Sequence, residues 1–165
     1  MITDDSIKHV AVIDKLKSED HCAIQFKKLT DSAKIPTRGS AEAAGLDLYA
    51  DIDTNQVIHS GETVMIGTGV AMMIPNYYAG FIYARSGLAS KRGIRPANCV
   101  GVVDSDYRGE IKVALHNDSN RAQLIQPGDR IAQMVIMPVA IMPVIETKEL
   151  PDTERGAGGF GSTGD

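Results

Sequence analysis

The sequence predicts an all-β fold, and three observations lead to this expectation. Short runs of apolar and β-branched residues recur along most of the chain. Turn-forming residues separate these runs at even spacing. Only one segment inside this pattern reads as a helix. Parallel βαβ sheets need a helix between successive strands, so regular short strands and turns favour a sandwich or a barrel.

Length and charge narrow the class of protein further. With 165 residues the chain is long enough for one domain with a substantial core. A net charge of −4 argues against general binding to nucleic acid or to membrane surfaces. No apolar stretch is long enough to span a membrane, and the N-terminus lacks a secretory pattern. We therefore expect a cytoplasmic protein, or one inside the host cell if its source is a virus.

The two cysteines also favour a protein inside the cell. Cys22 and Cys99 lie far apart and have no metal-ligand spacing. This usage is typical of a reducing compartment and predicts no zinc site.

The first 22 residues differ from the rest of the chain. The segment from Ser6 to Lys17 fits an amphipathic helix or an extra strand, and its periodicity does not decide between them. We treat residues 1–22 as an N-terminal extension without assigned chemistry. Residues 23–150 then form the β-barrel core, and residues 151–165 form a flexible, glycine-rich arm.

Eight strands are expected in the core, with one helix among them. The helix is predicted at Ser86–Lys91. The strands are predicted at Ala23–Leu29, Thr63–Gly67, Val70–Ile74, Gly80–Ala84, Cys99–Val103, Ile111–His116, Arg130–Val139 and Ala140–Glu146. Turn residues between them lie at Ser60–Gly61, Pro75–Asn76, Asn117–Asn120 and Gln126–Asp129.

The segment Gly101–Glu110 concentrates polar chemistry between two predicted strands. It sets an acid, an aromatic ring and a base in one short loop, which predicts a β-hairpin. Asp104 lies where a buried strand meets solvent, a suitable place for a general base that activates water. Asp and Ser also occupy turns for their local hydrogen bonds, so the segment taken alone is more typical of a structural turn.

The C-terminal segment Arg155–Gly164 is too rich in glycine to fold by itself. Glycine amides, two hydroxyls and an arginine are groups that bind phosphate oxygens, and Phe160 suits stacking on a flat ring. The segment lacks the lysine and the strand-to-helix context of a P-loop. A flexible tail of incidental composition is the alternative.

Three further segments carry polar groups in or beside apolar runs. Asp47 lies in the run Ala44–Ala50, where a charge is costly unless it is paired. Arg85 opens the predicted helix, and Gln133 lies inside a predicted strand. For each of them taken alone, a capping residue or a satisfied core polar group is the favoured explanation.

Taken together and in order, these five segments resemble the five motifs of the trimeric deoxyuridine triphosphatase (dUTPase) family. The matching segments are Ala44–Leu48, Arg85–Ala89, Gly101–Gly109, Gly128–Gln133 and Arg155–Gly164. The resemblance implies a jelly-roll-like β-barrel subunit in a homotrimer, with the C-terminal arm exchanged between subunits. It also implies Mg²⁺-assisted hydrolysis of dUTP to dUMP and pyrophosphate, with water attacking the α-phosphorus. Such an activity limits uracil incorporation into DNA and supplies dUMP for dTMP synthesis.

The resemblance also implies roles for individual residues. Asp104 is the expected catalytic base, and Asp47 is expected to reach Mg²⁺ through water while the substrate phosphates hold the metal. The expected substrate-binding residues are Arg85, Ser86, Gly87, Asn98, Gly101, Val102, Val103, Tyr107, Lys112, Gln133, Arg155, Phe160, Gly161, Ser162 and Thr163. Tyr107 is expected to pack on the deoxyribose, Asn98 to read the uracil edge, and Phe160 to stack on uracil.

Three residues depart from the family pattern. Leu46 and His116 stand where aromatic residues are common, and Glu110 replaces a frequent amide and adds a negative charge near the loop exit. None of them is an expected catalytic group.

Two other functions remain on the same fold. A bifunctional dCTP deaminase/dUTPase would need a catalytic Glu in the pocket. A non-catalytic nucleotide-sensing protein would be expected to lack the base or the arm, and neither is missing here.

Overall fold

The computed structural model describes residues 23–159, which form an all-β body followed by an extended arm. The all-β, jelly-roll-like expectation is confirmed. Its strands are β1 (Gln25–Lys28), β2 (Thr37–Arg38), β3 (Leu46–Tyr49), β4 (Gln56–Ile58), β5 (Thr63–Gly67), β6 (Val70–Met73), β7 (Tyr78–Tyr83), β8 (Ile94–Pro96), β9 (Gly101–Val103), β10 (Lys112–Asn117), β11 (Gln123–Ile125) and β12 (Arg130–Pro138). The helix α2 spans Ser86–Arg92.

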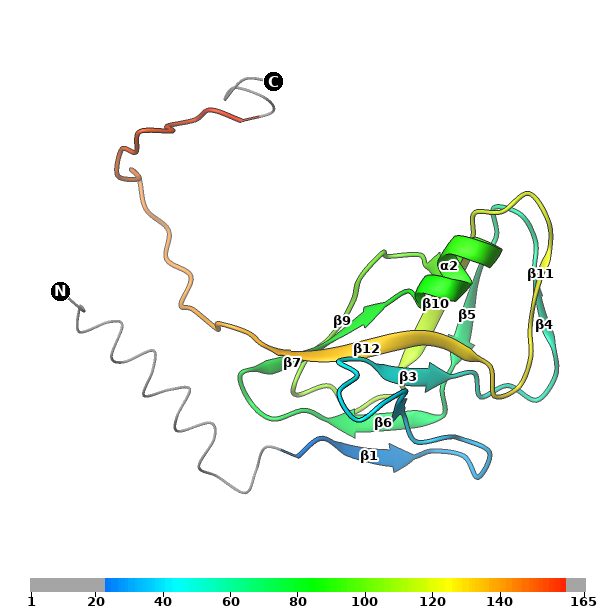
Figure 1. Cartoon of the computed structure of the whole chain (residues 1–165). Coiled ribbons are helices and arrows are strands. Elements are labelled where there is room, and N and C mark those ends of the chain that lie inside the picture. Colours follow the sequence, from blue (N-terminus) through cyan, green and yellow to red (C-terminus); the bar gives the residue numbers. More distant parts are fainter. Residues whose placement is uncertain (1–22, 160–165) are drawn as a thin grey trace.

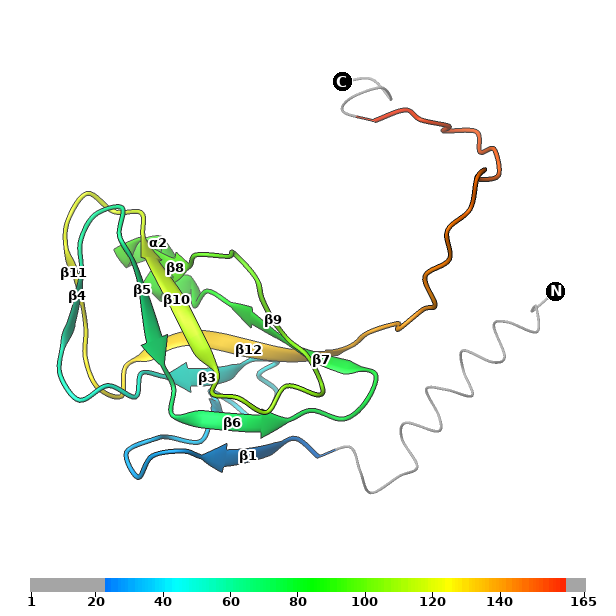
Figure 2. The same cartoon turned by 180° about the vertical axis from the view of Figure 1, so that it is seen from behind.

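The body is built from four antiparallel sheets. A five-stranded sheet has the order β2-β3-β12-β7-β9, and a three-stranded sheet has the order β5-β10-β8. The pairs β1-β6 and β4-β11 complete the body. Figure 1 shows β12, β7 and β3 toward the viewer, and Figure 2 shows β5 and β10 from the opposite side. The two larger sheets therefore face each other across the core.

Apolar side chains from both sheets fill the space between them. Leu48 and Met134 enter from the five-stranded sheet, and Ile66 and Leu115 enter from the three-stranded sheet. All four are at most 1% exposed, as expected for the inward face of alternating strands.

A buried asparagine holds one end of the sandwich together. Asn117 is fully buried at the end of β10, and its Nδ2 donates to the carbonyl oxygens of Ile58 and Arg121, 2.9 and 2.8 Å away. Its Oδ1 accepts hydrogen bonds from the backbone N–H and the hydroxyl of Ser119. The side chain is therefore satisfied without water and ties the end of β10 to the end of β4 and to the loop between β10 and β11.

The helix forms and ends as its sequence predicts. It begins after Arg85, whose backbone is extended, and ends at Gly93 with φ 68°. A left-handed residue at this position favours glycine because it has no Cβ. Lys91 and Arg92 in the last turn complement the negative end of the helix dipole.

Strand pairing differs from the sequence expectation in the middle of the chain. The predicted hairpin between β9 and β10 is wrong: β9 pairs with β7, whereas β10 pairs with β5 and β8. The loop that joins β9 to β10 crosses from one sheet to the other. Strand propensity detects the strands but does not determine which neighbour each one takes.

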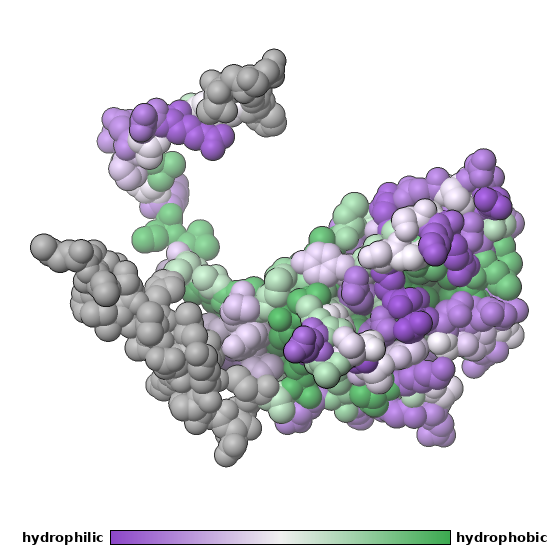
Figure 3. All heavy atoms as spheres, in the orientation of Figure 1, coloured by the Kyte–Doolittle hydropathy of each residue, from purple (hydrophilic) through white to green (hydrophobic). Residues whose placement is uncertain are grey.

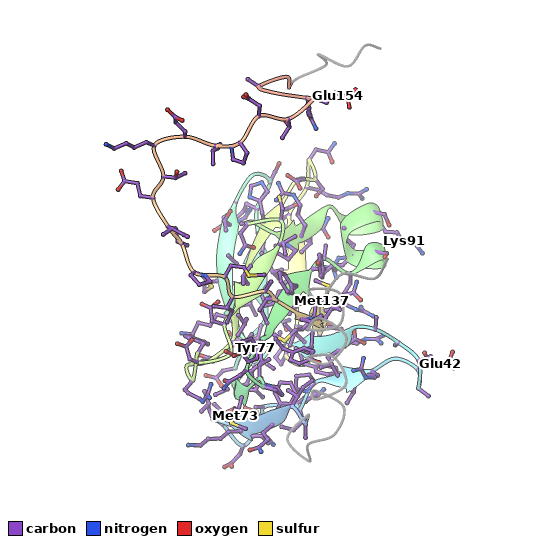
Figure 4. The ribbon with its side chains drawn as sticks, turned by 90° about the vertical axis from the view of Figure 1, so that its left-hand side faces the viewer. Glu42, Met73, Tyr77, Lys91, Met137 and Glu154 are labelled. Atoms are coloured by element: carbon purple, nitrogen blue, oxygen red, sulfur yellow. The ribbon has the colours of Figure 1, made fainter. Side chains whose placement is uncertain are left out.

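The strand expected at Ala140–Glu146 is also wrong for this chain. Beyond β12, the backbone pairs with no strand in the described residues, and Val139 N–H makes a last hydrogen bond to the carbonyl of Tyr77. Figure 1 shows the segment leaving the body as an arm, and Figure 4 shows Glu154 far beyond Met137, which lies near the root of the arm. Val144 and Ile145 are 100% and 87% exposed, so these apolar side chains of the arm pack on no part of the body that the structure describes.

The helix that the structure describes is too short to cross a membrane. The N-terminal extension, residues 1–22, and the segment 160–165 lie outside the described residues.

Candidate active site

A first pocket, which we name the loop pocket, lies at the loop that joins β9 to β10. Its volume is about 310 Å³. It is lined by Met65, Ile82, Asn98, Gly101, Val102, Val103, Asp104, Tyr107, Glu110, Ile111 and Lys112. Seven of the predicted site residues therefore lie together, although they come from β9, β10, the loop between them and the turn before β9.

The loop closes on itself through two hydrogen bonds at Tyr107. Its backbone N–H donates to the Asp104 carbonyl at 3.2 Å, and its hydroxyl donates to the Glu110 carbonyl at 3.0 Å. A side chain at Gly109 would collide with the Tyr107 ring, so glycine is needed for this close approach. The ring is 45% exposed and forms one wall of the pocket.

Asp104 begins the loop at the end of β9. It is exposed and lines the pocket, which leaves its carboxylate accessible to water and to a ligand. A carboxylate in this position can orient a water molecule and accept its proton.

The entrance to β9 is shaped by a second close approach. A Cβ at Gly101 would lie 3.4 Å from Nδ2 of Asn98 and 3.2 Å from Cβ of Ile82. Glycine here leaves room for the Asn98 amide beside the strand. Arg95 supports the same turn, because its guanidinium binds the Asp118 carboxylate and reaches the Ala97 carbonyl. The hydrogen bond to Asp118 raises the pKa of Arg95 above its ordinary value.

A second pocket, the phosphate pocket, has a volume of about 480 Å³. It is lined by Gly39, Ala43, Ala44, Gly45, Asp47, Arg85, Ser86, Gly87, Arg130, Gln133 and Val135. The predicted residues Asp47, Arg85, Ser86, Gly87 and Gln133 are thus brought together. They come from β3, β12 and the start of α2.

An ion triad forms the charged wall of the phosphate pocket. Oδ1 of Asp47 accepts a hydrogen bond from Nε of Arg85 at 2.8 Å, and Oδ2 accepts one from a terminal nitrogen of Arg130 at 3.2 Å. The Asp47 side chain is 12% exposed, whereas that of Arg130 is 50% exposed. One buried negative charge therefore holds two positive charges beside the pocket and leaves a net positive charge facing it.

Arg130 was not among the predicted site residues. Its position follows from an irregularity in β12, where the pairing with β3 shifts register between Arg130 and Ala132. Such a bulge redirects a side chain relative to a regular strand. The signal in the sequence was a second arginine within the segment Gly128–Gln133.

Gln133 is held against both neighbouring strands. Its Nε2 donates to the carbonyl of Ala84 at 3.0 Å, and a Cβ at Gly45 would lie 2.6 Å from its Oε1. The amide is therefore fixed at the pocket by β7 on one side and by a glycine on the other.

The residues present do not form a metal cage of their own. No group of three or more His, Cys, Asp or Glu side chains gathers within residues 23–159. Asp47 offers one carboxylate whose two oxygens already accept arginine donors. This set fits a hard cation that keeps its water and is held by ligand phosphates, the usual way in which proteins bind Mg²⁺.

The two pockets share no lining residue. The fifth motif lies apart from both, on the arm, where Nε of Arg155 bonds to the carbonyl of Gly158 in a turn. Figure 3 shows the base of this arm as a green, apolar stretch that is followed by hydrophilic residues. The predicted residues Phe160, Gly161, Ser162 and Thr163 lie outside the described residues.

Comparison with known proteins shows which family the sequence matches. The dUTPase family model matches residues 31–164. A deoxyuridine 5'-triphosphate nucleotidohydrolase of Nautilia profundicola is 53% identical over 141 residues, which cover 86% of this chain and 98% of that protein. The protein of the same name from a Hydrogenobaculum species is 49% identical and covers 84% and 95%.

Solved structures give the same result for the fold. A mutant dUTPase of Staphylococcus bacteriophage 80alpha, solved with dUpNHpp, superposes with a TM-score of 0.78 at 27% identity. The superposition covers 87% of this chain and 99% of the phage chain.

Proposed function

Because this chain belongs to the dUTPase family, it is a dUTP diphosphatase, and we propose how its residues hydrolyse dUTP to dUMP and pyrophosphate. The loop pocket binds the deoxyuridine, and the phosphate pocket binds the triphosphate. The observation that carries this assignment is Asp104 in one pocket with Asn98 and Tyr107, groups that suit a base and a sugar.

Asp104 acts as the general base. Its carboxylate accepts a proton from water while the water oxygen forms a bond to the α-phosphorus. The bond from the α-phosphorus to the bridging oxygen breaks, and pyrophosphate leaves with that oxygen. A carboxylate is a weak base, so its main contribution is to position the water.

Uracil binds between β9 and β10. Among the described strands β9 pairs only with β7, and the start of β10 pairs with β5 but not with β8, whose ladder begins at Leu115. Backbone groups near Val102 and Lys112, with the Asn98 amide, then read the uracil edge. Cytosine presents a donor where uracil presents an acceptor, and an unpaired polar group in the pocket discriminates strongly against it.

Tyr107 provides the sugar specificity. Its ring packs against the deoxyribose and leaves no room for a 2′-hydroxyl. Its position is supported by the hydrogen bond from its hydroxyl to the Glu110 carbonyl.

The phosphates bind to charged and hydrogen-bonding groups of the second pocket. Ser86 and the Gly87 amide contact the α- and β-phosphates, Arg85 adds positive charge, and Gln133 acts through the phosphate and water shell. Arg130 supplies a second guanidinium. In the described contacts only one terminal nitrogen of Arg130 donates to Asp47, which leaves other donors of this guanidinium for phosphate oxygens. Asp47 would contact the water around an Mg²⁺ ion carried by the substrate phosphates, and that ion would neutralise charge on the triphosphate.

A complete site needs more than one chain. The two pockets share no residue, and the arm with Arg155 runs away from its own body. We therefore propose a homotrimer in which neighbouring subunits supply the two pockets. The arm of a subunit closes over a neighbour's site, where Phe160 stacks on uracil and Arg155, Ser162 and Thr163, with the Gly161 amide, bind the γ-phosphate.

The test is pyrophosphate release by the purified protein with Mg²⁺ and dUTP, with dCTP, dTTP and UTP in parallel. Release from dUTP alone supports both the base and the sugar assignment. Binding of dUTP without release would favour nucleotide sensing, and ammonia release from dCTP would favour the bifunctional deaminase.

A further inference from the structure

The gap between β9 and β10 needs a support other than strand pairing. In a hairpin, ladder hydrogen bonds hold neighbouring strands about 4.8 Å apart. Here no ladder joins the two strands, because they belong to different sheets. The distance between β9 and β10, and with it the width of the loop pocket, therefore depends on the contacts that hold the loop where it enters β10.

Backbone hydrogen bonds of Ile111 and the Thr68 hydroxyl hold this point, and Glu110 adds the contacts of a carboxylate. Its Oε1 accepts a hydrogen bond from the backbone N–H of Gly69 at 3.0 Å. Its Oε2 lies 3.3 Å from Nζ of Lys112. One carboxylate thus joins the end of the loop, the start of β10 and the turn between β5 and β6.

The turn that receives Glu110 is shaped for this contact. Gly69 has φ 63°, a left-handed conformation that favours glycine. A Cβ at Gly67 would lie 2.5 Å from Oε1 of Glu110, so only glycine leaves room for the carboxylate there. Between these glycines, the hydroxyl of Thr68 donates to the carbonyl of Ile111 at 2.6 Å.

The same end of the loop carries the sugar-binding residue. The Tyr107 hydroxyl donates to the carbonyl of Glu110, so movement of Glu110 moves the acceptor of that bond. Glu110 also lines the pocket itself, with its side chain 27% exposed.

We infer that Glu110 is a positioning residue that sets the width of the loop pocket, and hence the selection of uracil over thymine. It acts through the hydrogen bond that it accepts from Gly69 N–H. This inference rests on the proposed binding of deoxyuridine in the loop pocket. It assigns no contact with the reacting atoms to Glu110.

Three substitutions of Glu110 separate the effect of its hydrogen bond with Gly69 from the effect of its negative charge. Glu110→Gln keeps an oxygen acceptor for Gly69 N–H and removes the charge. Glu110→Asp keeps the charge on a side chain one methylene shorter, and Glu110→Ala removes both. The control is Glu62→Ala, because Glu62 also accepts a backbone N–H, from His59 at 2.7 Å, but does not line either pocket.

The measurements are KM and kcat for dUTP and dTTP, with thermal unfolding of each variant. We expect Glu110→Ala to raise KM for dUTP about tenfold and to lower the preference for dUTP over dTTP by a similar factor, since a methyl group in a pocket is discriminated by about 10–200-fold. We expect kcat for dUTP to stay within about threefold of wild type, because Asp104 is unchanged. Glu110→Gln should restore KM and selectivity, and Glu110→Asp should resemble Ala.

Wild-type KM and selectivity in Glu110→Ala would overturn the inference, as would a Gln variant as defective as Ala. Parallel losses in Glu62→Ala would also overturn it, because they would indicate a general loss of stability. If Glu110→Ala does not fold, Glu110→Asp and Glu110→Gln decide the question. If the wild-type protein releases no pyrophosphate from dUTP, the proposed function fails, and calorimetric binding of dUMP and dTMP still tests Glu110.

Discussion

Nε of Arg85 donates a 2.8 Å hydrogen bond to Oδ1 of Asp47, and this contact connects two segments that lie 38 residues apart. Asp47 is on β3 and Arg85 follows β7, and both strands are neighbours of β12. Gln133 on β12 lies opposite Asp47 on one side and Tyr83 on the other. The strand register of the five-stranded sheet therefore brings the polar residues of the phosphate pocket together.

Substitution of Asp47 by Ala is expected to destabilise the subunit. It leaves Arg85 and Arg130 without the carboxylate that they share, and removing one partner of a buried ion pair is costly. Because both arginines are partly exposed, we expect a loss of about 1–3 kcal/mol rather than the full buried value. Thermal unfolding at fixed protein concentration measures it, and an unchanged Tm would contradict the structural role of the triad.

Asp104→Asn is expected to bind dUTP and to lose most turnover. The amide keeps the size of the side chain but cannot accept the proton of water, which costs about 10²–10⁴-fold in rate. Pyrophosphate release gives kcat, and calorimetry with a non-hydrolysable dUTP analogue gives affinity. Turnover near the wild-type value would refute the assignment of the base.

Arg130→Gln is expected to weaken the binding of dUTP more than that of dUMP. A charge-assisted hydrogen bond is worth about 1.5–3 kcal/mol, so we expect the dissociation constant for dUTP to rise at least tenfold. Because dUMP carries a single phosphate, its affinity should change less. Arg121→Gln removes the same charge outside both pockets and serves as the control; equal effects of the two variants would indicate a general charge effect.

Removal of all residues after Leu150 is expected to abolish most hydrolysis without unfolding the body. The described part of this segment makes its hydrogen bonds within itself, and the core cluster contains none of its residues. Light scattering reports the assembly and pyrophosphate release reports the activity. Full activity of the truncated protein would contradict a role for the arm in the site.

Asn117→Ala is expected to be among the most destabilising substitutions in the body. It removes the side-chain partner of the Ile58 carbonyl and of the Ser119 N–H in a region where Asn117 itself is fully buried, whereas the Arg121 carbonyl still accepts a hydrogen bond from the Ser119 hydroxyl. Each unsatisfied buried group costs about 1–3 kcal/mol, so we expect a loss of several kcal/mol. Chemical denaturation measures it, and Asn120→Ala, on the exposed loop nearby, is the control.

Local patterns predicted much of the fold. The strand at Thr63–Gly67 was predicted with its observed bounds, and the helix was predicted to within one residue. Short strands such as β4 and β8 were missed because three residues give too little periodicity to recognise. The pairing of β9 with β7 depends on contacts distant in sequence, which no local pattern contains.

The candidate site, like the fold, was predicted in part from local sequence, and the rest depends on contacts between distant segments. Four of the five motifs identified residues that the structure gathers into two pockets, because each motif is a continuous segment with characteristic chemistry. The position of Arg130 depends on a bulge in β12, and the contact between Glu110 and Gly69 depends on the approach of two sheets. Both follow from the packed structure and not from the order of residues.

The separation of the two pockets has a genetic consequence. If different subunits supply them, a chain defective in Asp104 and a chain defective in Arg130 damage different halves of a site. Unfolding and refolding equal amounts of the two defective proteins together would then yield mixed assemblies in which about a quarter of the sites combine two intact halves. Two alleles that each encode a defective chain would complement one another in the same cell.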